Sequence, residues 1–341
     1  MPVPPVKYGG TEAVIDRLAR GFVEAGHEVL LFATGDSTCP VPKKWVFEEA
    51  EGLRMGIAAL ELRHLIHAYE EVKGYDIVHD HTLIGPIFSG RYPGLHVVTT
   101  NHGPFNPELT DLYGAIADDI PIIAISHNQA SNAKDLHLAA VIHHGIDPEA
   151  FPVGDGAGDA DGDYYLFLGR MAPEKGARRA ADIARAAGVR LIIAAKMREP
   201  WEIDFFTNEI EPLLDDDIRF VGEVGGERKL RLLADAKALI NPIRWAEPFG
   251  LVMIEALACG TPVLAFKEGA APEIVDDGVT GFLCDHNDDM AATIEKVDTL
   301  ERSACRAAVE RYFSRRRMVD EHLALFERVL DGEHPRYVAP S

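Results

Sequence analysis

The sequence predicts an α/β protein built from two doubly wound domains that face each other across a cleft. Short apolar runs alternate along the chain with helical patterns, and strand–helix–strand repetition of this kind produces parallel sheets with right-handed crossovers. Runs such as Leu191-Ile-Ile-Ala-Ala195 show no polar alternation, which is typical of strands that are covered on both faces. A stretch of glycine and aspartate at 154–163 separates two halves of similar length.

Each predicted element follows from a local signal. Apolar runs predict strands at 28–34, 77–79, 96–100, 122–126 and 140–143 in the first half, and at 164–168, 190–195, 218–221, 238–241, 262–266 and 281–284 in the second. Strong helix formers predict helices at 11–25, 177–187 and 251–258, followed by Gly26, Gly188 and Gly260 as stops.

The predicted boundaries place a first domain at 1–153, a surface linker at 154–163 and a second domain at 164–313. The linker contains no apolar residue larger than alanine, as expected of a segment on the surface between two domains. Its Gly154, Gly156 and Gly158 have the spacing Gly-x-Gly-x-Gly, but they follow no predicted strand and open no predicted helix. They therefore do not form a dinucleotide-binding fingerprint.

The composition narrows the function classes. A formal net charge of −21 argues against a protein that binds nucleic acid or an anionic membrane surface. The four cysteines are scattered without Cys-x-x-Cys pairs, so neither a disulfide framework nor a zinc site is expected. No apolar run is long enough to span a bilayer, and we expect a cytoplasmic protein.

The segment from Trp245 to Gly260 carries two carboxylates, Glu247 and Glu255, on either side of a Pro-Phe-Gly turn. Glu247 is expected in the loop before a helix and Glu255 about one turn inside it. The amides at 249–252 would be the unpaired N–H groups of the helix start, which suit a phosphate. A diphosphate between two hydroxyl-bearing sugars fits this layout. The alternative is an ordinary buried helix that follows a solvated glutamate.

A second candidate segment opens the second domain, from Phe167 to Gly176. A strand runs into a loop that carries Arg170 and Lys175, and a helix follows. At the carboxyl end of a first strand, these cations and the helix start would converge on a phosphate. The alternative is that both cations pair with Glu174 on the surface.

These two motifs, together with three others, resemble glycosyltransferase family 4, the retaining nucleotide-sugar-dependent enzymes with a GT-B fold of two Rossmann-like domains. The resemblance covers nearly the whole chain. The three further motifs are Tyr8-Gly-Gly-Thr-Glu12, Asp76-Ile-Val-His-Asp-His81 and Thr99-Thr-Asn-His-Gly103. The resemblance also implies that a helix at 314–330 crosses back onto the first domain.

The resemblance implies a role for each candidate residue. Arg170 and Lys175 would bind the donor diphosphate with the amides of Gly250 and Leu251, and the loop of Gly9 and Gly10 would lie near phosphate and acceptor. Glu255 would bind the donor ribose. Glu247 and His102 would act at the transferred sugar as the catalytic residues.

The implied reaction moves a hexose from a nucleotide sugar, such as a UDP- or GDP-hexose, to an acceptor hydroxyl with retention of configuration. The acceptor would be a small molecule, a glycan or a lipid-linked sugar. Arg170 and Lys175 would stabilise the leaving diphosphate without a metal or other cofactor. Two alternatives stay open: another GT-B enzyme, such as a sugar phosphorylase or a nucleotide-sugar epimerase, and a non-catalytic protein that binds a sugar nucleotide.

Other histidines permit more than one interpretation. His79 and His81 flank Asp80 at a strand end, which fits a metal pair or, better, a buried hydrogen-bonding or acceptor-contact role. His143 and His144 precede a Gly-Ile-Asp turn and are interpreted as structural.

The chain departs from the family at its start, because only eight residues precede Gly9 and residues 1–7 contain three prolines. Such a segment cannot supply the central first strand of a doubly wound sheet. We therefore expect the native protein to begin upstream of Met1, with an apolar strand of about five or six residues that ends near Pro4 and Pro5.

Overall fold

The computed structural model describes residues 1–54 and 56–339. The chain forms two compact units. Unit 1 comprises Met1–Gly145 and Arg315–Ser341, and unit 2 comprises Ile146–Ser314. Among the described residues, no helix combines the length and the apolar character needed to cross a bilayer.

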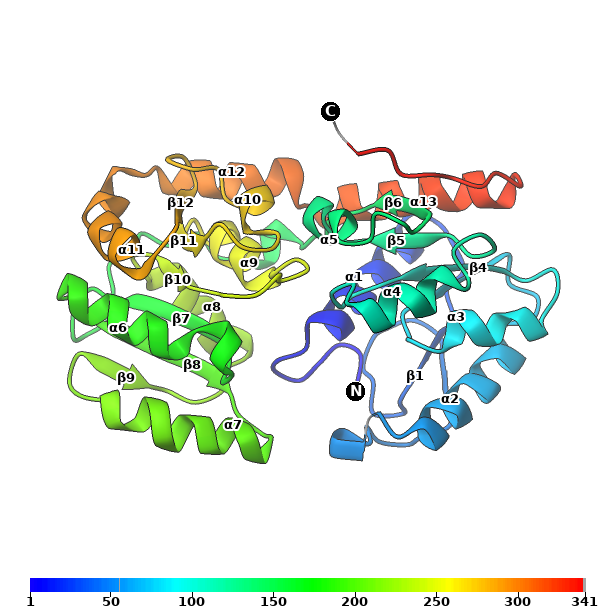
Figure 1. Cartoon of the computed structure of the whole chain (residues 1–341), viewed down its shortest axis with the longest axis horizontal. Coiled ribbons are helices and arrows are strands. Elements are labelled where there is room, and N and C mark those ends of the chain that lie inside the picture. Colours follow the sequence, from blue (N-terminus) through cyan, green and yellow to red (C-terminus); the bar gives the residue numbers. More distant parts are fainter. Residues whose placement is uncertain (55, 340–341) are drawn as a thin grey trace. The chain divides into compact units, whose positions relative to one another are not determined.

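Unit 1 contains two parallel sheets with helices between their strands (Figure 1). Its elements are α1 (Gly10–Glu24), β1 (Leu31–Ala33), β2 (Lys43–Trp45), η1 (Gly52–Arg54), α2 (Ala58–Glu71), β3 (Ile77–Asp80), α3 (Gly85–Phe88), η2 (Ser89–Arg91), β4 (His96–Thr100), α4 (Pro107–Gly114), β5 (Ile122–Ala124), α5 (His127–Ser131), β6 (Leu138–Val141) and α13 (Arg315–Leu330). The larger sheet has the order β3-β4-β5-β6, and β1 pairs with β2 in the smaller one.

The start of the chain packs into the core of unit 1 although it forms no strand. Val3 is buried with Ala19, Leu31 and Ala33. Its backbone N–H donates to Ser37 Oγ at 3.0 Å. The strand β2 was not expected, because Lys-Lys-Trp offers no apolar run.

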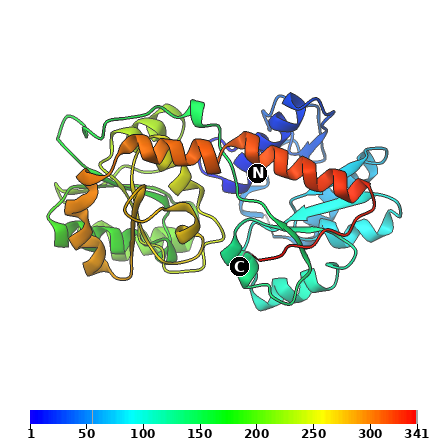
Figure 2. The same cartoon turned by 90° about the horizontal axis from the view of Figure 1, so that it is seen from above.

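The last helix of the chain, α13, belongs to unit 1 and packs against α1. Val319 of α13 lies so close to Gly21 of α1 that a Cβ on Gly21 would come within 2.3 Å of it. Beyond α13 the chain turns back along unit 1 (Figure 2). There Tyr337 N–H donates to Leu138 O of β6 at 2.7 Å.

Unit 2 is one six-stranded parallel sheet with helices on its faces (Figure 1). Its elements are η3 (Pro148–Ala150), β7 (Tyr165–Arg170), η4 (Pro173–Lys175), α6 (Ala177–Ala187), β8 (Leu191–Lys196), α7 (Pro200–Phe205), the π-helix η5 (Phe206–Ile210), η6 (Glu211–Leu213), β9 (Ile218–Phe220), α8 (Gly226–Asp235), β10 (Leu239–Asn241), α9 (Leu251–Ala258), β11 (Val263–Phe266), α10 (Ala271–Ile274), β12 (Gly281–Cys284), α11 (Asn287–Thr293), η7 (Ile294–Thr299) and α12 (Arg302–Tyr312). The strand order is β12-β11-β10-β7-β8-β9.

The core of unit 2 lies between its sheet and helices. Ile193 of β8, Ile240 of β10 and Leu264 of β11 are fully buried there, together with the alanine face of α6. Strands buried on both faces need continuous apolar runs, which is why the sequence predicts this sheet so closely.

The segment at 154–163, predicted as a surface linker between the domains, is hydrogen-bonded to unit 2. Gly154 N–H donates to Cys259 O at 3.0 Å, and Arg302 Nε donates to Gly154 O at 2.8 Å. The boundary between the units instead falls at Gly145 and Ile146.

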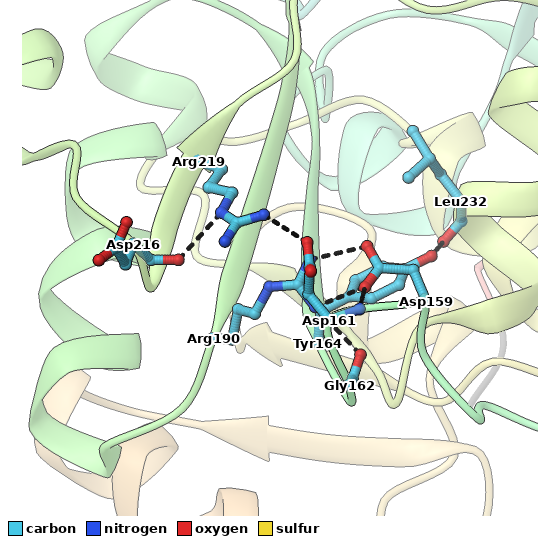
Figure 3. A network of polar contacts seen from close by, with 8 residues as sticks. All are labelled: Asp159, Asp161, Gly162, Tyr164, Arg190, Asp216, Arg219 and Leu232. Atoms are coloured by element: carbon cyan, nitrogen blue, oxygen red, sulfur yellow. Dashed lines mark hydrogen bonds and ion pairs between the residues drawn. The ribbon is translucent and has the colours of Figure 1, made fainter.

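Two arginines hold the acidic part of this segment (Figure 3). Arg190 Nη1 and Nη2 bind the two oxygens of Asp159 at 2.7 Å each, and Nη1 also donates to Gly162 O at 3.0 Å. Arg219 Nη1 binds Asp161 Oδ2 at 2.6 Å. These partners follow the segment by many residues, so its composition alone does not reveal them.

We expect Arg190→Ala to loosen this segment and to lower the free energy of unfolding by about 1–2 kcal/mol, because a partly buried forked contact is lost. Arg231→Ala is the matched control, since Arg231 is exposed and its nearest carboxylate oxygen, on Glu227, is 3.7 Å away. Urea unfolding and limited proteolysis measure the two effects. Cleavage within 155–163 at the wild-type rate in Arg190→Ala would contradict this account.

Candidate functional site

The candidate site of unit 2 lies where the order of its strands reverses. β7 comes first in the chain but lies inside the sheet, with β8 on one side and β10 on the other. The loops that leave the carboxyl ends of β7 and β10 therefore start side by side. Ligands of doubly wound sheets bind at this kind of position.

The side chain of Arg179 on α6 links these two loops. Arg179 donates from Nε to Pro242 O at 2.8 Å and from Nη2 to Glu174 O at 2.9 Å. Gly176 has a φ of 91°, and a Cβ there would come within 2.5 Å of Pro242 O. A side chain at position 176 would force the loops apart, so glycine is required at this close approach.

The site brings together two residues that the sequence predicts for different ends of the ligand. Lys175, in the loop after β7, forms an ion pair with Glu247, in the loop after β10. Both side chains are 15% exposed. Trp245 Nε1 also donates to Glu247 Oε2 at 2.6 Å. The Lys175 ammonium lies 5.0 Å from the centre of the Trp245 ring, a cation–π distance.

Arg170, the last residue of β7, has a buried carboxylate as its partner. It forms an ion pair with Glu202, whose side chain is fully buried, and its guanidinium lies 4.7 Å from the centre of the Trp201 ring. Glu202 Oε2 also accepts from the N–H groups of Arg198 and Glu199 at 2.6 and 2.9 Å. Burial acts to raise the pKa of Glu202, but these donors hold it below its usual value.

Glu255 lies on α9, and it too is paired. Its side chain is 9% exposed, and its Oε2 lies 2.6 Å from Lys229 Nζ on α8. Gly250 precedes α9 with a φ of 96°, and Leu251 is the first residue of that helix. The helix start predicted at these two residues is therefore present beside the loop of Glu247.

The other two predicted residues lie in unit 1. Gly10 is the first residue of α1. His102 follows β4, and its Nε2 lies 2.9 Å from Nδ1 of His81. The loop of His102 is held by Gln129, whose Nε2 donates to Asn101 O at 2.9 Å and to Gly103 O at 2.6 Å.

His102 belongs to a cluster of histidines in unit 1. The members are His79, His81, His102, His144 and His322, with ring centres 4.0 to 5.3 Å apart along the chain of contacts. Burial lowers the pKa of each imidazole, to about 4 for His102 and His322 and well below the usual value for the other three. The cluster is therefore neutral at pH 7.

The residues on either side of Asp80 have hydrogen-bonding roles. His79 Nε2 pairs with Thr100 Oγ1 at 2.7 Å, and His81 pairs with His102. Asp80 alternates to the other face of the strand, where it accepts from Tyr69 OH at 2.7 Å and from Thr82 N–H at 2.7 Å. These contacts match the buried hydrogen-bonding interpretation of the motif.

The sequence motifs did not indicate three residues that contact the candidate site: Glu202, Lys229 and Trp245. Glu202 and Lys229 lie on short or polar helices without any motif, and only the tertiary fold places them beside Arg170 and Glu255. Trp245 stands inside the first candidate segment, two positions before Glu247. That proximity is the one signal by which it could have been found.

Comparison with known proteins identifies the family. Residues 8–150 match the model of Glycosyltransferase Family 4, and residues 156–315 match that of Glycosyl transferases group 1. The D-inositol 3-phosphate glycosyltransferase of Mycolicibacterium smegmatis is 30% identical over 315 residues, which cover 78% of this chain and 70% of that protein. The chain belongs to glycosyltransferase family 4.

Solved structures show the fold. AviGT4, a glycosyltransferase involved in avilamycin A biosynthesis, is 28% identical, with a TM-score of 0.73 over 97% of this chain and 93% of that one. Sucrose-phosphate synthase from Thermosynechococcus elongatus is 20% identical, with a TM-score of 0.79 over 95% and 94% of the two chains. The protein is thus a glycosyltransferase with the GT-B fold of two Rossmann-like units.

The lowered pKa values of the histidine cluster predict that unit 1 of this glycosyltransferase is less stable in acid. The pKa of His322 is about 4 in the folded protein, and the usual value is 6.5. As the pH falls from 6.5 toward 4, the unfolded chain therefore binds a proton that the folded protein does not, and the free energy of unfolding decreases. Above pH 6.5 this histidine causes no loss of stability. We expect His322→Asn to reduce the slope of unfolding free energy against pH by about 1.4 kcal/mol per unit in this range.

Urea unfolding at several pH values measures this slope. His334→Asn is the control, because His334 is exposed in the tail after α13. An unchanged slope in His322→Asn would show that this histidine is not held neutral by the fold.

Proposed function

We propose that the protein transfers a hexose from a nucleoside-diphosphate hexose to an acceptor hydroxyl, with retention of configuration. The donor diphosphate would bind in unit 2 to Arg170, Lys175 and the amides at Gly250 and Leu251. The observation that carries the proposal is the contact between Lys175 and Glu247. It brings a cation suited to phosphate beside a carboxylate suited to sugar hydroxyls, as a sugar diphosphate requires.

The chemistry needs positive charge at the leaving group. When the bond between the anomeric carbon and the diphosphate breaks, negative charge grows on the phosphate and positive charge on the sugar. Arg170 and Lys175 would stabilise the phosphate, and Glu247 would face the sugar. We infer that these cations take the place of a metal ion, so no metal or other cofactor is assigned.

Both proposed phosphate-binding cations are already paired with carboxylates, so donor binding would have to rearrange these ion pairs. Lys175 is engaged by Glu247, and Arg170 by Glu202. A bound diphosphate would draw Lys175 toward itself and leave Glu247 to accept hydrogen bonds from the sugar. Binding of the phosphate and orientation of the sugar are thereby coupled through one ion pair.

The remaining candidates complete the proposed donor site. Glu255 would accept from the ribose hydroxyls while Lys229 holds its Oε2. His102 would contribute a neutral imidazole at the transferred sugar, since its pKa of about 4 leaves it uncharged at pH 7. It would therefore act as a hydrogen-bonding partner rather than as a cation. Gly10 would lie near phosphate and acceptor at the start of α1.

Experiments with different nucleotide sugars and acceptors would identify the donor base, the transferred sugar and the acceptor. We propose a UDP- or GDP-hexose as donor and a small-molecule, glycan or lipid-linked hydroxyl as acceptor. The relative from M. smegmatis is named for D-inositol 3-phosphate, which makes phosphorylated and free inositols the first acceptors to test. Family membership favours transfer over the phosphorylase, the epimerase and the non-catalytic binder.

We expect Arg170→Ala and Lys175→Ala each to weaken binding of UDP or GDP by about 10- to 100-fold, because each removes a charge-assisted contact. Calorimetry measures the affinity. Arg185→Ala is the control, since Arg185 pairs with Asp215 on the surface of the same unit.

Arg170→Ala also leaves buried Glu202 without its guanidinium. The double variant Arg170→Ala/Glu202→Gln restores stability and should bind the diphosphate as weakly as Arg170→Ala. Wild-type affinity in the double variant and in Lys175→Ala would place the phosphates elsewhere.

Glu247→Ala should reduce transfer by more than about 10-fold and leave diphosphate affinity unchanged or higher, because it removes a sugar contact and releases Lys175. Turnover is measured with a saturating donor in EDTA, in which we expect full wild-type activity. Glu209→Ala, at an exposed carboxylate paired with Arg178, controls for loss of charge. Wild-type turnover in Glu247→Ala would contradict the role of Glu247 at the transferred sugar.

A further inference from the structure

We propose that Trp245 is a positioning residue that holds the Glu247 carboxylate in its reactive orientation while the donor occupies Lys175. This inference rests on the proposed function, because it assumes that Glu247 acts on the transferred sugar. It assigns a specific task to a side chain that lies beside the carboxylate and whose role no motif suggests.

The local chain geometry places the indole at the carboxylate. Only Ala246 separates Trp245 from Glu247, and Glu247 N–H donates back to Trp245 O at 2.7 Å in a tight turn. This turn brings the two side chains together, with Trp245 Nε1 donating to Glu247 Oε2 at 2.6 Å. A hydrogen bond to a charged acceptor at this distance is strong.

A second loop fixes the backbone of Glu247. Ala270 N–H donates to Glu247 O at 3.0 Å. Gly269, with a φ of 56°, passes so close that a Cβ there would come within 2.5 Å of the Glu247 backbone N and O. With its main chain held on both sides, Glu247 retains freedom only in its side chain.

Both donors to this carboxylate act on the same oxygen. Lys175 Nζ and Trp245 Nε1 each contact Oε2. Among the described residues, this arrangement leaves Oε1 to accept from a substrate. The Lys175 ammonium also lies over the Trp245 ring, 5.0 Å from the ring centre. The indole therefore contacts both members of the ion pair.

The two donors would part when the donor binds. The diphosphate would attract Lys175, which would weaken its contact with Glu247, but it would attract the uncharged indole N–H far less. Trp245 would therefore remain on Oε2 and keep the carboxylate from rotating into solvent. Its loss should affect the chemical step more than the binding of the nucleotide.

Trp245→Phe tests this, because phenylalanine keeps an aromatic ring but has no N–H that could donate to Glu247. We expect kcat to fall by about 10- to 100-fold, while the affinity for UDP or GDP stays within about twofold of wild type. The matched control is Trp45→Phe in unit 1, where Lys43 lies 5.5 Å from the ring centre. An unchanged kcat, or an equal loss in kcat and affinity, would overturn the proposal.

A second measurement does not depend on turnover. The chain has three tryptophans, so its nitrogen-15 spectrum contains three indole signals, which Trp→Phe variants assign. Glu247→Ala should shift the Trp245 indole signal and leave those of Trp45 and Trp201 in place. If the Trp245 signal does not move, the positioning role is wrong. A wild-type protein that binds and transfers no nucleotide sugar would instead overturn the proposed function, while the signal still reports whether Trp245 holds Glu247.

Discussion

β7 is the first strand of unit 2 in the chain, but it lies inside the sheet between β8 and β10. The loops that leave β7 and β10 therefore start beside each other, at the carboxyl ends of these two central strands. Arg170 and Lys175 follow β7, and Glu247 follows β10. This neighbourhood of strands brings Lys175 and Glu247, 72 positions apart in the chain, into an ion pair. Gly176 and Arg179 then hold the two loops together.

The site is close to neutral, although it contains several charges. Each proposed cation has a carboxylate partner, Glu202 for Arg170 and Glu247 for Lys175, and the proposed ribose ligand Glu255 pairs with Lys229. The chain as a whole carries a net charge of −21, so a diphosphate must be attracted by local contacts rather than by a broad positive field. In the proposed site, Lys175 would exchange Glu247 for phosphate and so supply such a contact, while Trp245 would keep the carboxylate in place.

The sequence predicted the sheet of unit 2 well, because strands such as Leu191–Lys196 are buried on both faces and must be continuously apolar. It failed where the signal is tertiary. Lys43–Trp45 forms a strand without an apolar run, and Arg190 and Arg302 bind the segment at 154–163 through contacts that its composition does not reveal. In the candidate site, motif spacing indicated Arg170, Lys175 and Glu247 as ligands. It could not show which carboxylate each cation contacts, because the partners come from loops far away in the chain.

A crystal structure of this glycosyltransferase with a nucleoside diphosphate tests the central claim most directly. The account predicts that the phosphates contact Arg170, Lys175 and the amides at the start of α9, and that Lys175 leaves Glu247 while Trp245 Nε1 remains on Oε2. A diphosphate bound away from the carboxyl ends of β7 and β10, or bound there with the ion pair of Lys175 and Glu247 intact, would contradict it.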